Sequence, residues 1–165
     1  MDIYQFAMRM ERDGEMFYRQ LAQECPEPGL AGIFTMLAEE EVKHYRVISR
    51  LSKKEKEPLP SESAILRDVK NVFIAMQAEK IELRIDTTKA AIAYRKACDL
   101  EDQSQQFYVQ KAEVVADAHE RQIFLRLAKE EEKHLRIMEN IVEFVTRREP
   151  GNWLENAEWH HLDEY

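Results

Sequence analysis

The sequence predicts an all-α protein, a four-helix bundle assembled from two copies of one helix pair. Three observations favour this class. Residues that form helices readily, such as Ala, Leu, Glu and Lys, dominate the 165-residue chain, whereas glycine and proline number only four and five. Few segments alternate apolar and polar residues as a half-buried strand would. The first and last parts of the chain also align with each other without a gap, which indicates an internal duplication.

The duplicated segments are residues 4–46 and 94–136. About a third of the aligned positions are identical, which is several-fold above chance. We therefore expect two structural repeats, over about residues 3–54 and 87–148. Identical pairs with polar side chains include Glu11 and Glu101, Glu41 and Glu131, His44 and His134, and Tyr18 and Tyr108.

Four long helices are expected, in two pairs. They span about residues 3–24, 30–54, 87–116 and 119–148. A cluster of two prolines and one glycine at residues 25–29 separates the first helix from the second. Thr87 and Thr88 suit the N-cap of the third helix, and the fourth helix ends before Pro150 and Gly151.

The connector over residues 55–86 begins with two prolines and then becomes amphipathic. Its apolar residues at helical spacing are Leu66, Val69, Phe73 and Met76. This spacing predicts a further helix with one apolar side. A long link between two like helix pairs suits a ferritin-like bundle, in which one crossover connection runs along the length of the bundle.

Length and charge limit the classes of partner. The length predicts one domain, which we place at residues 1–148, followed by a C-terminal tail at 149–165. The formal net charge of −8 argues against nucleic acid as a partner. No apolar stretch approaches the roughly 20 residues of a membrane span, and no signal peptide is evident. Cys25 and Cys98 form no C-x-x-C motif, so we expect reduced thiols in a cytoplasmic protein.

Acidic and histidine side chains interrupt the apolar stripes of the four helices. In the second and fourth helices, a Glu-x-x-His unit occupies two central core positions where leucine would be expected. In the first and third helices, a glutamate lies midway between two tyrosines on one stripe. The six candidate metal ligands are therefore Glu11, Glu41, His44, Glu101, Glu131 and His134. Four carboxylates and two imidazoles form the ligand set of a dinuclear metal site in a helix bundle.

The charge balance supports a metal site. Four buried carboxylates without cations would repel one another and lose their hydration. Two divalent ions carry the compensating charge and leave both histidines neutral. An oxygen-rich site with one imidazole per metal suits iron or manganese, and zinc is compatible with the same ligands. The alternative, a solvated polar face, would require the flanking residues Leu37, Ile48, Leu127 and Met138 to face outward as well.

Tyr18 and Tyr108 lie two turns from Glu11 and Glu101 on the same stripes. Two roles stay open for these tyrosines. They either donate hydrogen bonds to the ligand carboxylates as a second shell, or they only fill the core. No catalytic residue beyond the metal ligands is expected.

Two motifs occur in each half of the chain. The first half has E-x-x-G-x-x-F-Y-x-x-L-A at residues 11–22 and L-A-E-E-E-V-K-H at 37–44. The second half has E-D-Q-S-Q-Q-F-Y at 101–108 and L-A-K-E-E-E-K-H at 127–134. Together these motifs resemble the rubrerythrin-like branch of the ferritin-like superfamily, and the resemblance extends over roughly residues 3–148. It implies a non-haem centre of two iron ions, which Glu41 and Glu131 bridge, with the other four candidates as terminal ligands.

The resemblance also implies an activity and its partners. Rubrerythrins proper append a rubredoxin domain with two C-x-x-C motifs, and this sequence has no such motif. We therefore expect reduction of hydrogen peroxide or dioxygen with electrons from a separate rubredoxin-type protein, in a homodimer. Rubrerythrins tend to carry a further glutamate one turn from the ligand of the third helix, where this sequence has Cys98 and Ser104. Ferritin-like iron oxidation and storage, and a non-catalytic bundle that senses metal or oxygen, are the alternative functions.

Overall fold

The computed structural model describes residues 1–146, and α-helices account for most of them. The helices are α1 (Ile3–Glu24), α2 (Pro28–Ser52), α3 (Ile65–Ala78), α4 (Thr87–Val114) and α5 (Ala118–Thr146). No strand occurs within these residues. The predicted all-α class is thus confirmed. The predicted tail at 149–165 and the last residues of the predicted fourth helix lie outside the described part of the chain.

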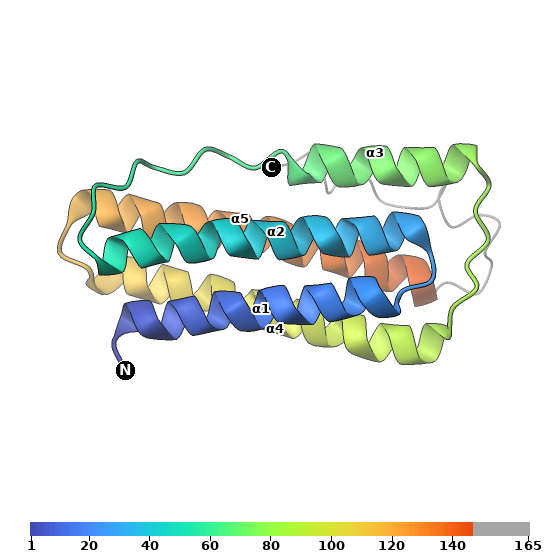
Figure 1. Ribbon diagram of the computed structural model, residues 1–165, viewed down its shortest axis with the longest axis horizontal. Coiled ribbons are helices and arrows are strands. Elements are labelled where there is room, and N and C mark those ends of the chain that lie inside the picture. Colours follow the sequence, from blue (N-terminus) through green and yellow to red (C-terminus); the bar gives the residue numbers. More distant parts are fainter. Residues whose placement is uncertain (147–165) are drawn as a thin grey trace.

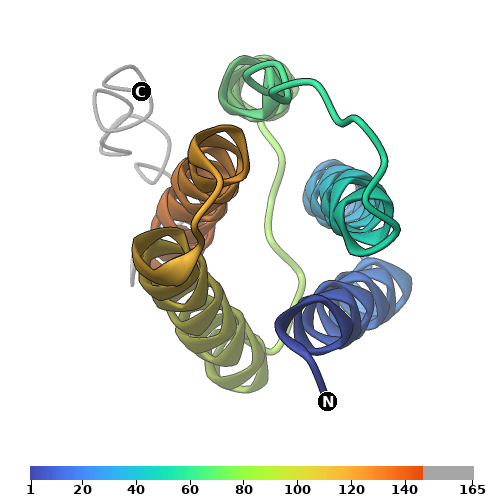
Figure 2. The same cartoon turned by 90° about the vertical axis from the view of Figure 1, so that its left-hand side faces the viewer.

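The four long helices run side by side along one axis (Figure 1). Seen end-on, the bundle consists of two antiparallel hairpins, α1–α2 and α4–α5, that face each other (Figure 2). Packing is close within each hairpin and sparser between the two. Residues 53–64 return along the length of the bundle to α3, which lies against α2 and α5 (Figures 1 and 2). The crossover and its amphipathic helix are therefore as predicted, and the four residues predicted to form its apolar side, Leu66, Val69, Phe73 and Met76, are buried.

The start of α2 differs from the prediction. The helix begins at Pro28 rather than near Leu30. Proline is tolerated in the first turn of a helix because its missing N–H would have no partner there. Glu27 acts as the N-cap, and its carboxylate accepts a hydrogen bond of 2.6 Å from the Leu30 amide. The breaker cluster thus contains the first residues of the helix.

The start of α4 also differs in one detail. Its N-cap is Asp86 rather than Thr87 or Thr88. The Asp86 carboxylate accepts a hydrogen bond of 3.1 Å from the Lys89 amide. Aspartate is at least as good an N-cap as threonine, so the helix begins at the first of the two threonines.

The duplication is visible in the burial of the side chains. Residues 11–20 and 101–110 have the same succession of buried, half-buried and exposed side chains. Two apolar clusters fill the interior, and the central turns of the four helices lie between them. This central layer contains the predicted polar residues. No helix among residues 1–146 has the length and apolar character to cross a membrane.

Candidate metal centre

All six predicted ligands lie in the central layer of the bundle. Each long helix contributes to it, α1 and α4 with one glutamate and α2 and α5 with a Glu-x-x-His unit. None of the six residues is more than 4% exposed. The interpretation of these residues as a solvated face is therefore excluded.

The six residues form two overlapping groups. One group consists of Glu11, Glu41, His44 and Glu131, and the other of Glu41, Glu101, Glu131 and His134. Within each group, one potential ligand atom per residue lies within 4.8 Å of the others. Glu41 and Glu131 belong to both groups. The arrangement could therefore hold two ions that share two carboxylates.

Both histidines direct Nδ1 toward the carboxylates. His44 Nδ1 lies 2.8 Å from Glu131 Oε1 and 3.6 Å from Glu11 Oε2. In the second copy, His134 Nδ1 lies 3.0 Å from Glu41 Oε1. The two imidazole rings are stacked, with their centroids 5.5 Å apart and their planes 9° from parallel. Each histidine thus presents the same nitrogen to the carboxylates on the opposite hairpin.

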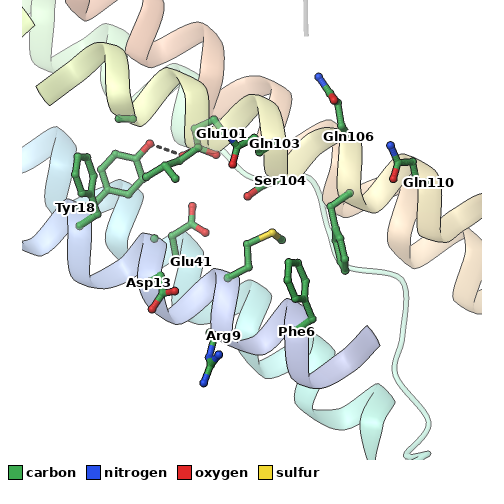
Figure 3. A pocket seen from close by; sticks show the side chains of 16 residues that line it. Phe6, Arg9, Asp13, Tyr18, Glu41, Glu101, Gln103, Ser104, Gln106 and Gln110 are labelled. Carbon is green, nitrogen blue, oxygen red and sulfur yellow. Dashed lines mark hydrogen bonds between the residues drawn. The ribbon is translucent and has the colours of Figure 1, made fainter. Parts of the chain in front are cut away.

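The two buried tyrosines hydrogen-bond to the carboxylates. The Tyr18 hydroxyl donates to Glu101, as Figure 3 shows, and the Tyr108 hydroxyl donates to Glu11. Each bond joins α1 and α4. The same rings also belong to the two apolar clusters. Each tyrosine thus donates a hydrogen bond to a candidate ligand and also packs in the core.

Burial and neighbouring charges shift the pKa values of the buried glutamates in different directions. Burial raises the pKa of Glu41 well above its usual range, and the charge of Glu131 raises it further. The same two causes raise the pKa of Glu101 to about 8. Burial would raise the pKa of Glu131 too, but the charge of His44 and hydrogen bonds from both histidines hold it well below its usual range. At neutral pH these pKa shifts favour the protonated form of Glu41 and Glu101 and the ionised form of Glu131.

The surrounding carboxylates raise the pKa values of both histidines. Burial favours the neutral imidazole, but the charge of Glu131 outweighs it and raises the pKa of His44 to about 10. At His134 the charge of Glu101 likewise outweighs burial and raises the pKa well above its usual range. Without metal, protons therefore supply part of the positive charge that the acids need. Cations that bind here must displace those protons.

A second polar layer, which the sequence analysis missed, lies beside the centre. Glu40 and Glu130 are buried, although each directly precedes a candidate ligand and was not expected inside. Ser63 of the crossover joins them, because its hydroxyl donates to Glu40 Oε1 at 2.9 Å and its amide donates to Glu130 Oε1 at 3.3 Å. Lys133, 2% exposed, completes the layer with Nζ 3.0 Å from Glu130 Oε1. The identity of these Glu and Lys residues in both repeats was the available signal.

This layer lies close to the imidazoles. One carboxylate oxygen of Glu40 and one nitrogen each of His44 and His134 lie within 4.8 Å of one another. Within the described residues, Glu130 Oε2 and His134 Nε2 are buried without a hydrogen-bond partner. Ligating histidines usually donate their second N–H to a carboxylate or a water. The second polar layer is placed to hold both imidazoles in this way.

A cavity of about 380 Å³ lies between α1 and α4 and reaches the centre. Glu41, Glu101 and Tyr18 line its inner end. Figure 3 shows Glu41 and Ser104 directed into the space between the two helices. Gly14 permits this approach, because a Cβ atom at that position would lie 3.3 Å from Glu41 Oε2. The candidate centre is therefore accessible from one side of the bundle.

A family model described as Rubrerythrin matches residues 2–142, a range that includes all six candidate ligands. Neither the curated proteins nor the solved structures gave a match.

Proposed function

The chain belongs to the rubrerythrin family, and from this membership we propose that it is a non-haem di-iron oxidoreductase that reduces hydrogen peroxide or dioxygen. The family supports an iron-binding site within a ferritin-like helical bundle. The observation that carries the proposal is the pair of overlapping acid–histidine groups, buried and accessible through a cavity. The electrons for the reduction of hydrogen peroxide or dioxygen would come from a separate rubredoxin-type protein.

Each ion would be held by one of the two groups. Glu41 and Glu131 belong to both groups, so they would bridge the ions. Glu11 with His44, and Glu101 with His134, would complete the two sites as terminal ligands. The donor set fits the metal by charge, because four carboxylates balance two divalent cations. It fits by chemistry too, since mixed oxygen and imidazole donors suit iron, with manganese and zinc as competitors.

The bound metal would supply redox equivalents and a template for the peroxide or dioxygen. The chain's own residues orient and shield this site. The Tyr18 and Tyr108 hydroxyls hold Glu101 and Glu11 in place, and the apolar clusters on either side exclude bulk water. The cavity between α1 and α4 offers the route to Glu41 and Glu101.

Stopped-flow kinetics with chemically reduced rubredoxin tests the proposal. Two molecules of this one-electron donor should be oxidised for each hydrogen peroxide consumed by the iron-loaded protein. The Glu41→Ala variant should lose this turnover, whereas Glu39→Ala, a matched change at an exposed position on the same helix, should retain it. Iron uptake and oxidation without donor consumption would favour ferritin-like iron handling. Metal binding without turnover under any donor would favour a sensor.

The oligomeric state is a separate part of the proposal. We propose a homodimer, in which the subunits either pack as intact bundles or exchange helices. Light scattering on the full-length protein should give twice the mass of the 19.6 kDa chain. The mass of a single chain would contradict this part alone and leave the proposed chemistry intact.

A further inference from the structure

The cavity between α1 and α4 is larger than the small oxidants require. Hydrogen peroxide has two heavy atoms, whereas a cavity of roughly 150 Å³ already binds a benzene ring. The volume of about 380 Å³ lies within the range of sites for organic molecules. Access of peroxide or dioxygen therefore does not account for its size.

The walls of the cavity are mainly apolar. Met10, Phe17 and Leu100 line the cavity, and so do Phe6 and Phe107, whose rings contact each other with their centroids 5.1 Å apart. In Figure 3, the polar side chains Arg9 and Gln106 point away from the space between the helices. An apolar group would thus find a surface to contact along most of the cavity.

Polar groups gather at the inner end of the same cavity. The carboxylates of Glu41 and Glu101 and the Tyr18 hydroxyl line that end. Ser104 points into the space close to them (Figure 3). A ligand with one polar end and an apolar body matches this division, with the polar end at the candidate metal centre.

We propose that the cavity binds organic hydroperoxides, with an alkyl or aryl group against the apolar wall and the O–O group at the centre. This inference rests on the proposed peroxide-reducing function and specifies its substrate class. In the reaction, the hydroperoxide takes up two electrons, which originate from the reduced donor protein, and its O–O bond breaks. A metal pair held by the candidate ligands would supply the redox equivalents. Two protons are taken up, and the products are the alcohol and water.

A graded series at Ser104 tests the assignment. Ser104→Ala removes the hydroxyl without adding volume, whereas Ser104→Leu and Ser104→Phe fill the cavity progressively from one wall. For each variant, the ratio of kcat/KM for cumene hydroperoxide to kcat/KM for hydrogen peroxide is measured with reduced rubredoxin as donor. We expect the ratio to fall with side-chain volume, by about tenfold or more for phenylalanine. Val109→Phe, on the same helix but outside the cavity lining, should leave the ratio as in the unmodified protein.

A binding measurement provides a readout that does not depend on turnover. The product alcohol, 2-phenyl-2-propanol, is titrated into the full-length protein as purified and followed by calorimetry. We expect saturable binding with one site per chain, weakened about tenfold or more by Ser104→Phe and unaffected by Val109→Phe. The leucine variant keeps the test decisive if the phenylalanine variant does not fold.

The outcomes separate this inference from the function on which it rests. Reduction of hydrogen peroxide with no reduction of cumene hydroperoxide, or with a ratio that is constant across the series, would overturn the inference and leave the proposed function intact. If the unmodified protein reduced neither hydrogen peroxide nor cumene hydroperoxide, the proposed function itself would be contradicted. Failure of the alcohol to bind would overturn the cavity's assignment directly.

Discussion

Each of the six candidate ligands has a partner in the opposite helix hairpin. The histidines face Glu131 and Glu41, and the remaining two glutamates accept hydrogen bonds from Tyr108 and Tyr18. These contacts join two hairpins that otherwise pack only sparsely against each other. The polar residues of the centre therefore join the two halves of the bundle as well as forming a metal-binding geometry.

Loss of one shared carboxylate should reduce the metal content. Glu41→Ala removes an oxygen donor from both groups, and His134→Ala removes the one imidazole of the second group. We expect metal affinity to fall by more than the 10–100-fold that is typical for changes beyond the direct ligands, by about 100-fold or more. Elemental analysis after gel filtration measures the effect, with Glu39→Ala as control. Full metal content in both variants would remove these residues from the ligand set.

The tyrosine hydroxyls should stabilise the fold through the carboxylates that they hold. Tyr108→Phe removes a buried hydrogen bond to Glu11. Bonds to charged groups contribute about 1.5–3 kcal/mol, so we expect the free energy of unfolding to fall by this amount. Tyr45→Phe is the matched control, because the Tyr45 hydroxyl has only a long, exposed bond of 3.4 Å from Arg12. Urea denaturation measures both variants, and equal stabilities would contradict the structural role.

At the scale of the helices, the duplication is not fully symmetric. Lys43 and Lys133 occupy equivalent positions, and each pairs with the glutamate one turn earlier. The Lys43 side chain is 66% exposed, whereas that of Lys133 is 2% exposed. The chain offers the same ion pair once at the surface and once in the interior.

Replacement of the two lysines should therefore lower the free energy of unfolding by different amounts. Lys133→Met leaves Glu130 buried without its cation, and removal of one partner of a buried pair costs about 3–5 kcal/mol. Lys43→Met breaks an exposed pair and should cost less than about 1 kcal/mol. Chemical denaturation of both variants measures the difference in the free energy of unfolding. A loss in Lys133→Met no larger than that in Lys43→Met would show that the buried pair does not stabilise α5.

The helices were predictable because their signals are local. Periodicity, breakers and the repeat predicted the described bounds of the four long helices to within a few residues, and the apolar spacing in the connector predicted a further helix there. The cap of α4 was misplaced because Asp86 and the two threonines after it are all suitable caps, and only the structure distinguishes them. The burial of Glu40 and Glu130 was missed because it depends on Ser63 of the crossover, which is distant in sequence. Long-range packing of this kind leaves no periodic pattern.

At the scale of the whole molecule, the predicted stripes converge on one centre. The candidate ligands were predictable because the same tetrapeptide recurs on two core stripes. The cavity was not predictable, because its volume depends on how far α1 and α4 stand apart. That separation is a property of the assembled bundle.

Metal binding should strengthen as the pH rises. In the metal-free protein, His44, with a pKa of about 10, and Glu101, with a pKa of about 8, both hold protons at neutral pH. Binding of cations releases these protons, so a higher pH favours binding and a lower pH opposes it. For Mn²⁺ between about pH 6 and 7.5, we expect affinity to rise about tenfold per pH unit for each proton released. Calorimetry in buffers of different ionisation enthalpy counts the protons, and a pH-independent affinity would contradict the assignment.

We infer that cations make the buried acids tolerable in the interior of the bundle. Elemental analysis of the full-length protein, purified without added metal and combined with its absorption spectrum, tests this claim most directly. We predict two iron ions per chain and the absorption of an oxo-bridged ferric pair. Protein that is fully folded with its bundle intact, yet contains no metal and binds none when iron is supplied, would contradict the account.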